Sequence, residues 1–248
     1  MILELRLVES TRTEAIRACF VRLFERFGLP GAIRSDNGPP FAAPRGLLGL
    51  SRLSVWWLAL GIQLERGRPG HPEDNGAHER MHGDLFRELE REGVGRDQDA
   101  FDIWREEYNT VRPHEALGMA TPSEIHRPSE RRYEGTPEDL DYGALTTRRV
   151  DSNGMISFRN EAIRISESLA GWSVGLRPAA EGSIQEVYFA ELFLGHIDPQ
   201  VSAFFAAKPP APPSPGPAAA APSSGSATLR RSKARGVPRK ARPSSSKV

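Results

Sequence analysis

Apolar positions along the chain follow two different periods, and each period predicts a different kind of element. Residues 2–8 alternate apolar and polar side chains, which predicts a half-buried β-strand. Short apolar segments at 32–35 and 62–64 predict two more strands. Apolar residues spaced three and four apart predict helices, which we expect before Gly28 and over 50–60, 75–92 and about 101–108. Strands that alternate with helices indicate an α/β layer fold.

The pattern changes to a period of two between residues 147 and 198, which predicts a small all-β barrel of about five strands. Asn153-Gly154 separates the first two of these apolar segments, and Asn-Gly is typical of a tight hairpin turn. We therefore expect four segments with distinct roles. They are an α/β core at 1–127, a charged linker at 128–146, the barrel at 147–200 and a tail at 206–248 that is too rich in Pro, Ala and Ser to fold.

Composition narrows the class of protein without defining its function. Hydrophobic residues make up 38% and charged residues 26% of the 248-residue chain, which is ordinary for a water-soluble domain. The sequence has no apolar run of about 18 residues, so we expect no membrane span. Its single cysteine, Cys19, excludes an internal disulfide and a cysteine-rich zinc site, and a reducing cytoplasm is the simplest setting.

The net charge of +1 conceals an uneven distribution of charge. Residues 208–248 carry nine basic residues and no acidic ones, which leaves 24 basic against 32 acidic residues in the rest of the chain. The net charge of the expected folded part is therefore negative. Any contact of that part with nucleic acid must use local arginines, with help from the basic tail.

The segment HPEDNGAHERMH, residues 71–82, supports two incompatible interpretations. His78 and His82 with Glu79 fit H-E-x-x-H, the helix of zinc peptidases in which two histidines bind the metal and the glutamate is the base. Such an enzyme needs a third protein ligand, and the sequence after His82 lacks the x-x-G-x-x-H continuation that supplies one. Asn75-Gly76 also places His78 in the first turn of its helix, whereas the corresponding helix of zinc peptidases begins well before its first histidine. These features disfavour zinc.

Glu79 can instead serve a magnesium ion together with a second carboxylate. Asp36 follows the strand predicted at 32–35, and Glu79 lies at the start of the helix that follows the strand at 62–64. Magnesium prefers oxygen ligands and is commonly held by one or two carboxylates, water and substrate phosphate. Two such ions activate the attacking group and stabilise the leaving oxygen of a phosphodiester.

Several motifs in the right order resemble the retroviral-integrase-type catalytic core of insertion-sequence transposases, a DDE family. They are SDNGPPF at 35–41, GI at 61–62, RPGHPEDNG at 68–76, HERMH at 78–82, YN at 108–109, RPHEAL at 112–117 and TP at 121–122. The similarity covers about residues 1–127. Residues 147–198 also resemble the small β-barrel that follows this core in one transposase branch.

The resemblance implies an RNase H-like mixed sheet with flanking helices, incomplete at its N-terminus. It implies that Asp36 and Glu79 are the second and third carboxylates of a catalytic metal triad that uses Mg²⁺ or Mn²⁺. It also implies DNA as the partner, both transposon ends and target, bound by a homo-oligomer, with neither a membrane nor a small-molecule substrate. We expect DNA integration and transposition by two-metal cutting and joining of phosphodiesters.

The family's first aspartate lies on a strand before the one that residues 2–8 resemble, and this sequence starts after that point. We therefore expect an N-terminally truncated transposase that is inactive in this form. The alternative is a non-catalytic protein that binds DNA or interacts with a transposase. An in-frame aspartate encoded just upstream would change the expectation.

The remaining candidate residues surround the two carboxylates in sequence. Asn37, Asn75, His78 and His82 are candidate supporting residues. The two asparagines either shape the metal site or cap turns, and the two histidines either pair with Glu79 or face solvent. Four arginines are candidates for contacts with DNA phosphates, namely Arg66, Arg68, Arg80 and Arg87. We expect Arg112 and His114 to lock the last helix of the core against the sheet rather than to contact DNA.

Overall fold

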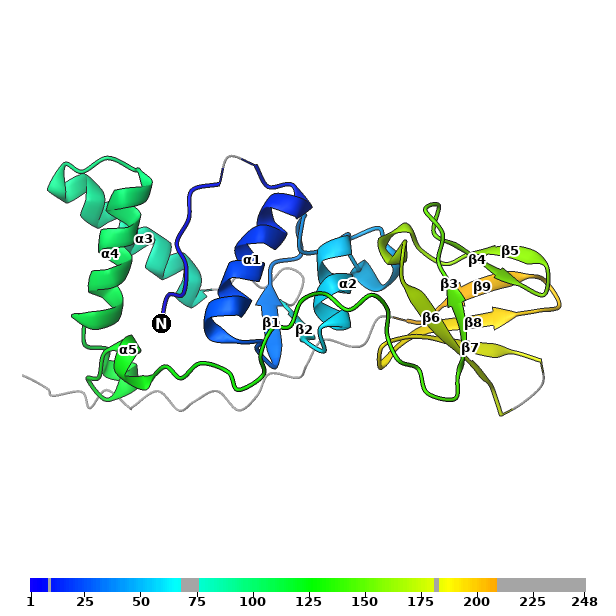
Figure 1. The fold of residues 1–248 in the computed structure, drawn as a ribbon. Helices are drawn as coiled ribbons and strands as arrows, with labels where there is room; N and C mark the ends of the chain where they lie inside the picture. The colour runs from blue at the N-terminus through cyan, green and yellow to red at the C-terminus, as the bar shows by residue number, and fades with distance from the viewer. Residues whose placement is uncertain (9, 68–75, 181–182, 209–248) are drawn as a thin grey trace, which may run out of the picture. The chain divides into compact units, whose positions relative to one another are not determined.

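Two short strands in the first half of the chain pair in parallel. The computed structural model describes residues 1–8, 10–67, 76–180 and 183–208. Strand β1 (Ala32–Ser35) pairs with β2 (Gln63–Arg66) in the register Ala32 with Gln63 and Ser35 with Arg66. Helix α1 (Thr13–Phe27) precedes this pair, and α2 (Arg52–Ala59) connects its strands after a short 3-10 turn at Leu47–Gly49 (Figure 1). The strand–helix–strand order matches the α/β expectation for this part of the chain.

Helix α2 is positioned by a polar cap and a cluster of aromatic side chains. The Ser51 hydroxyl accepts a hydrogen bond from the Ser54 N–H at 3.1 Å, and the Ser54 hydroxyl accepts one from the Ser51 N–H at 2.8 Å. This reciprocal cap fixes the first turn. One hydrophobic cluster then joins α1, α2 and the loop residues beside the strands, and its buried members are Phe24, Leu29, Leu53, Trp56, Trp57, Leu60 and Ile62.

The N-terminal segment is not the strand that its alternation predicts. Residues 1–8 carry no strand assignment, yet side chains of α4 (Gln98–Thr110) bind their backbone as a neighbouring strand would. Asn109 donates to the Ile2 carbonyl and accepts from the Ile2 N–H, both at 2.8 Å. Gln98 donates to the Leu5 carbonyl at 2.9 Å and accepts from the Leu7 N–H at 3.0 Å. Polar side chains therefore replace a sheet partner here.

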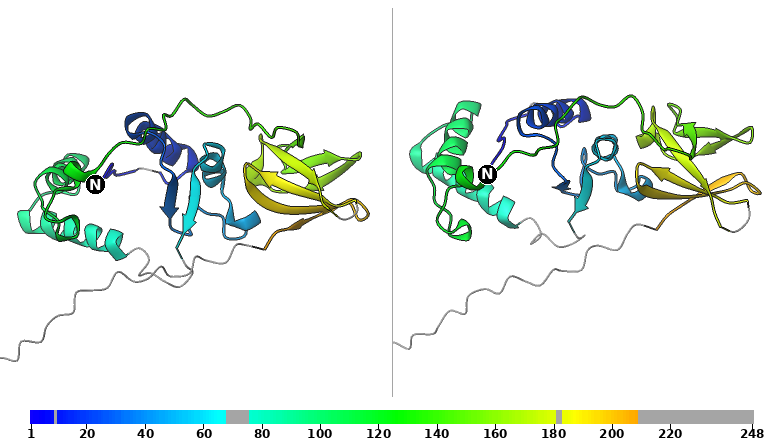
Figure 2. Two further views of the ribbon diagram at one scale, coloured as in Figure 1. Left: turned by 90° about the horizontal axis from the view of Figure 1, so that it is seen from below. Right: turned by 60° about the horizontal axis from the view of Figure 1, so that its bottom comes forward.

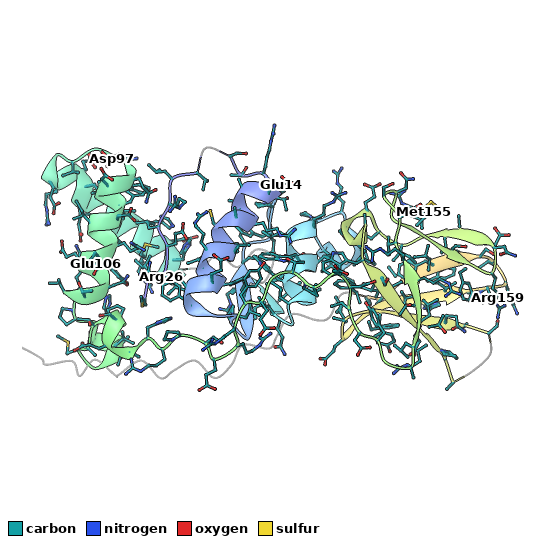
Figure 3. The ribbon with its side chains drawn as sticks, viewed as in Figure 1. Glu14, Arg26, Asp97, Glu106, Met155 and Arg159 are labelled. Carbon is teal, nitrogen blue, oxygen red and sulfur yellow. The ribbon has the colours of Figure 1, made fainter. Side chains whose placement is uncertain are left out.

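Helices α3 (Gly76–Glu92) and α4 share a separate hydrophobic cluster with this N-terminal segment. Its buried side chains are Leu5, Leu85, Leu89, Ala100, Phe101 and Trp104. Asp97 caps α4 by accepting a hydrogen bond from the Ala100 N–H at 2.9 Å, and Figure 3 shows Asp97 where the helix begins. The short helix α5 (Pro122–Ile125) follows, after a 3-10 turn at Glu115–Leu117.

A polar cluster joins α3 to the end of α4. Glu88 accepts hydrogen bonds from the Trp104 indole at 2.7 Å and from Arg112 at 2.9 Å. The Arg112 guanidinium also lies over the Trp104 ring, 5.2 Å from its centroid. These bonds hold the pKa of Glu88 below its usual value, with the Arg112 hydrogen bond as the largest cause. Arg112 therefore holds the end of α4 against α3, and not against the sheet as expected. His114 contacts Tyr108 on α4, with 4.7 Å between ring centroids.

The second half of the chain is an antiparallel β domain. One sheet has the order β3-β6-β7-β8-β9, formed by Thr146–Arg149, Ser173–Pro178, Gln185–Phe189, Leu192–Asp198 and Ala203–Ala206. Figure 2 shows these strands, green to orange, as one twisted sheet. A hairpin of β4 (Met155–Phe158) and β5 (Glu161–Arg164) contacts β3 and β9, the two edges of that sheet. The domain is therefore all-β and nearly closed, as predicted, with seven strands where about five were expected.

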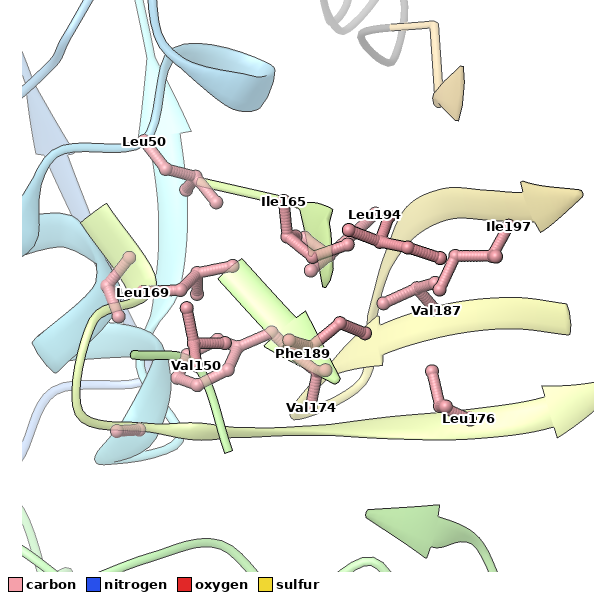
Figure 4. Close-up of a cluster of buried hydrophobic side chains, with 14 residues drawn as sticks. Leu50, Val150, Ile165, Leu169, Val174, Leu176, Val187, Phe189, Leu194 and Ile197 are labelled. Atoms are coloured by element: carbon pink, nitrogen blue, oxygen red, sulfur yellow. The ribbon is translucent and has the colours of Figure 1, made fainter. Parts of the chain in front are cut away.

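Alternating apolar side chains fill the interior of this β domain. The cluster in Figure 4 includes Val174, Leu176, Val187, Phe189, Leu194 and Ile197 from the large sheet. Leu50, Val55 and Ala59 belong to the same cluster, so α2 and the turn before it contribute to it. Gly195 is required where β8 passes β9, because a Cβ on it would lie 2.1 Å from the Phe205 carbonyl oxygen.

The Asn153-Gly154 turn exists, but it does not connect two paired strands. Gly154 has a φ of 77°, and its N–H donates to the Asp151 carbonyl at 3.0 Å, so the tight turn is as predicted. Strand β3, however, pairs with β6, and β4 pairs with β5. The prediction that the segments on either side of the turn pair with each other is wrong: β3 joins the large sheet, whereas β4 forms a separate two-stranded hairpin with β5.

Residues 126–145 contain no helix or strand and are held by individual polar contacts. They cover the linker expected at 128–146 except for its last residue, Thr146, which begins β3. Arg131 donates to the Leu60 carbonyl at 2.7 Å, and the Trp56 indole donates to Thr136 at 2.9 Å. Asp139 accepts from the Ser173 N–H at 3.0 Å, and the Tyr142 hydroxyl donates to the Ser173 carbonyl at 2.7 Å. Both ends of this segment are thus tied to regular elements.

The predicted tail at 206–248 lies, from residue 209 on, outside the described residues. Among the residues that the structure describes, none of the helices combines the length and the apolar composition that crossing a membrane requires.

Candidate functional site

Parallel pairing places the carboxyl ends of β1 and β2 at one edge of the sheet. Ser35 and Arg66 are the last residues of the two strands and are direct partners in the register. Asp36 is the next residue after β1, so its backbone lies at that edge, as the sequence predicted. On the strands themselves, Arg34 and Glu65 form an exposed ion pair at 3.1 Å. In α/β proteins, ligands bind beyond the carboxyl ends of parallel strands.

Asp36 begins a tight turn in which its carboxylate is exposed. The Gly38 N–H donates to Asp36 Oδ1 at 3.3 Å, and the Phe41 N–H donates to the Gly38 carbonyl at 3.0 Å. A side-chain oxygen that accepts from the backbone two residues on is the usual behaviour of aspartate in turns. One long hydrogen bond leaves both carboxylate oxygens with lone pairs for a cation.

Asn37 connects this turn to the end of the neighbouring strand. Its side-chain amide donates a hydrogen bond to the Gly67 carbonyl at 2.9 Å. Gly67 follows Arg66, the last residue of β2, so the contact bridges the carboxyl ends of both strands. Asn37 therefore fixes the position of the turn that presents Asp36, which supports its prediction as a supporting residue.

Glu79 lies in the first turn of α3, and its side chain is exposed. A carboxylate is favourable at this position because the N-terminus of a helix carries a partial positive charge. Asn75 and Arg68 lie in the segment between β2 and α3, outside the described residues. Both carboxylates of the predicted metal pair, those of Asp36 and Glu79, are therefore exposed, and each lies where the sequence predicted.

His78 and His82 face each other one turn apart on α3. Their ring centroids are 4.5 Å apart and the ring planes are nearly perpendicular, at 89°. His82 also stacks on Phe86, with 6.2 Å between centroids. Burial lowers the pKa of His82, and the neighbouring His78 lowers it further.

The predicted DNA-contacting arginines differ in exposure. Arg66 is half-buried on the inner face of β2, where it donates to the Gly49 carbonyl at 3.2 Å, and burial lowers its pKa. Its hydrogen bond holds the turn before α2, and a contact of Arg66 with DNA stays a prediction. Arg80 and Arg87 are exposed, and Arg87 forms an ion pair with Asp84 at 3.0 Å.

Within the described ranges, no group of three or more His, Cys, Asp or Glu side chains is arranged to hold one metal ion. A three-ligand zinc site around His78 and His82 is therefore not formed by those residues. The oxygen donors of Asp36 and Glu79 still have the chemistry that magnesium and manganese prefer.

Comparison with known families assigns two segments of the chain. Residues 60–122 match the integrase core domain, and residues 145–203 match the C-terminal domain of IS481 family transposases. The first match includes Glu79, and Asp36 lies before it. Each segment is similar to its family model, and the two together cover just under half of the 248-residue chain.

Curated relatives of the chain are insertion-element proteins. It is 32% identical over 102 residues to "Insertion element IS407 uncharacterized 31.7 kDa protein" of Burkholderia multivorans. It is 31% identical over 103 residues to "Insertion element IS476 uncharacterized 39.2 kDa protein" of Xanthomonas euvesicatoria. Each match spans 40% of this chain but only 34% and 28% of the two relatives.

Solved structures similar to the chain include two retroviral proteins. The catalytic core domain of BIV integrase is 27% identical, with 49% of this chain and 75% of that chain covered and a TM-score of 0.39. A simian T-cell lymphotropic virus intasome in complex with PP2A regulatory subunit B56 gamma is 16% identical, with 78% and 67% covered and a TM-score of 0.39. The likeness of the chain to integrases and transposases rests on the two domain matches and the curated relatives.

Proposed function

We propose that this chain is the DNA-processing part of an insertion-element transposase, whose chemistry is metal-dependent hydrolysis and transfer of DNA phosphodiesters. One observation carries the proposal: an integrase core segment and a transposase C-terminal domain follow one another in a single chain. The core segment contains Glu79, and Asp36 is presented at the carboxyl end of β1. The partners proposed are transposon ends and target DNA, bound by several copies of the chain.

Asp36 and Glu79 are the residues that would hold a divalent ion, Mg²⁺ or Mn²⁺. Both carboxylates are exposed, and their oxygens are the hard donors that these ions prefer. When bound, the ion supplies activation of the attacking oxygen and stabilisation of the leaving oxygen. Asn37 keeps the Asp36 turn against the end of β2 through its bond to Gly67. Arg80 and Arg87, exposed on the same helix as Glu79, are the proposed phosphate contacts.

We further propose that the chain by itself binds DNA and metal but does not complete strand transfer. The family chemistry uses three carboxylates, and the described residues gather no such group of three. Two carboxylates can still raise the affinity for DNA through an ion that both the protein and a phosphate coordinate.

The test is a DNA-binding titration of the full chain with a fluorescent duplex, in Mn²⁺ and in chelator. The proposal expects Mn²⁺ to increase the affinity at constant ionic strength, and expects the increase to disappear in Asp36→Asn and in Glu79→Gln. Glu106→Gln is the matched control, because Glu106 is an exposed carboxylate on α4 (Figure 3) and should behave as the wild type. Plasmid nicking and strand transfer, assayed in parallel, should stay at background.

A non-catalytic DNA-binding protein is the second candidate, favoured by the match of the β domain to a transposase C-terminal domain. This function predicts equal DNA affinity in Mn²⁺ and in chelator, and no effect of the two carboxylate substitutions. The same titration therefore separates the two functions.

A further inference from the structure

A pair of histidines on α3 forms a second candidate metal site, distinct from the carboxylates. His78 and His82 are four residues apart, so they lie on one face of the helix, one turn apart. His78 is exposed and His82 is half-buried, which leaves the space outside the pair open to solvent. Imidazole nitrogen suits Zn²⁺, Cu²⁺ and Ni²⁺, whereas Mg²⁺ prefers oxygen ligands.

The geometry of the two rings fits simultaneous coordination of one ion. With metal–nitrogen bonds of about 2.0–2.1 Å and angles of roughly 90–110° at the metal, two coordinating imidazoles have centroids about 4.5–5.2 Å apart. The observed centroid separation is 4.5 Å, at the lower end of this range. The ring planes are at 89° to each other in an edge-to-face contact, so coordination of one ion requires the exposed His78 ring to turn until a nitrogen of each ring faces that ion.

Packing restricts the orientation of one of the two rings before any metal binds. His82 stacks on Phe86 at 6.2 Å, and the Arg96 guanidinium covers that phenyl ring, 4.5 Å from its centroid. Phe86 in turn contacts Phe101 on α4, with 6.4 Å between centroids. A ligand whose rotamer is already fixed loses less conformational entropy on binding than a free surface side chain does.

We propose that His78 and His82 bind a borderline transition-metal ion, Zn²⁺, Ni²⁺ or Cu²⁺, as a two-nitrogen chelate with water in the remaining positions. Two protein ligands are fewer than a structural or peptidase zinc site requires, so the chelate is open and exchangeable. Binding cross-links the first and second turns of α3 and stiffens the part of the helix that carries Glu79. The proposal does not depend on the carboxylate site, because neither Asp36 nor Glu79 is a ligand in it.

Isothermal titration of the full, untagged chain with Ni²⁺, Zn²⁺ and Cu²⁺ tests this site. We expect one ion per chain and an affinity order of Cu²⁺ over Ni²⁺ and Zn²⁺. His78→Ala and His82→Gln should each weaken Ni²⁺ binding at least tenfold, and the double variant should abolish it. His196→Ala is the matched control, since His196 is also stacked on a phenyl ring, that of Phe205, but has no second histidine beside it. Its Ni²⁺ affinity should equal that of the wild type.

Two further measurements test the histidine site without a histidine variant and distinguish it from the carboxylate site. The electron paramagnetic resonance spectrum of bound Cu²⁺ should show coupling to two imidazole nitrogens. Glu79→Gln should retain Ni²⁺ binding while it loses the Mn²⁺ effect on DNA affinity, and excess Mg²⁺ should not displace Ni²⁺. Undiminished Ni²⁺ binding by the double histidine variant, or no saturable binding by the wild type up to 1 mM Ni²⁺, would overturn the proposal.

Discussion

The contact between Asn109 and Ile2 gives the sharpest prediction about stability. Asn109 is 4% exposed, and its amide makes two hydrogen bonds of 2.8 Å to the N–H and carbonyl of Ile2. Substituting alanine removes both bonds and leaves two backbone groups of a half-buried residue without protein partners. Each lost bond costs about 1 kcal/mol, and more where water cannot replace it, so we expect a loss of roughly 2–3 kcal/mol in unfolding free energy.

Chemical denaturation of Asn109→Ala should show this loss as a lower midpoint, and thermal unfolding should shift by roughly 4–12 °C for a domain of this size. Hydrogen exchange at residues 2–7 should accelerate more than at α2, because the segment is held by α4 side chains. Asn153→Ala is the control, since Asn153 is exposed in the turn before β4 and its loss should change stability by less than about 0.5 kcal/mol.

Asn109→Asp separates the two bonds, because a carboxylate keeps the acceptor for the Ile2 N–H but cannot donate to its carbonyl. We expect this variant to be destabilised at neutral pH, where two oxygens face each other. A wild-type midpoint in Asn109→Ala, together with unchanged exchange at residues 2–7, would refute the reasoning that side chains of α4 substitute for a neighbouring strand.

Three further predictions concern other contacts. Gly175→Ala should destabilise the chain by about 1–3 kcal/mol, because a Cβ there would lie 2.5 Å from the Tyr142 ring. Gly31→Ala is the control and should be tolerated, because a Cβ at Gly31 would have no atom within 4 Å. Thermal unfolding of the two variants compares them. Glu88→Gln should destabilise the chain at neutral pH but not in acid. Because folding lowers the pKa of Glu88, the ionised carboxylate stabilises the fold above the usual glutamate pKa, and this stabilisation disappears as the pH falls through the folded-state pKa. Chemical denaturation of wild type and variant at several pH values measures the difference. Burial raises the pKa of Tyr142 to about 12, so Tyr142→Phe should reduce the tyrosine absorbance change near that pH, which a spectrophotometric titration measures.

The sequence predicted those parts of the fold in which periodicity and local chemistry agree. Helix α2, helix α3 and strand β1 lie within a few residues of their predicted positions, because each has a clear period and a terminating turn. Residues 2–8 have a period of two but no strand beside them, and alternation alone does not supply a partner. The contacts of Arg131 and Thr136 come from isolated polar residues without a period, so no sequence pattern could reveal them.

The candidate site was predictable to a similar degree. Asp36 and Asn37 follow from a strand that ends in a turn, and the bond from Asn37 to Gly67 supplies a structural reason for the asparagine. Arg66 was assigned to DNA because it is basic, but it shares the inner face of β2 with Leu64, two residues earlier. That spacing was visible in the sequence and could have indicated an inward side chain.

The central claim is that Asp36 and Glu79 hold one divalent ion together. Its most direct test is a Mn²⁺ titration of the full chain, followed by the loss of the free-ion electron paramagnetic resonance signal, in a cycle of wild type, Asp36→Asn, Glu79→Gln and the double variant. A shared ion predicts that each single substitution weakens binding nearly as much as both together, since either carboxylate alone is a poor site. The claim is contradicted if the single variants keep wild-type Mn²⁺ affinity, or if their losses of binding free energy add up to that of the double variant. Either result would show that the two carboxylates do not share an ion.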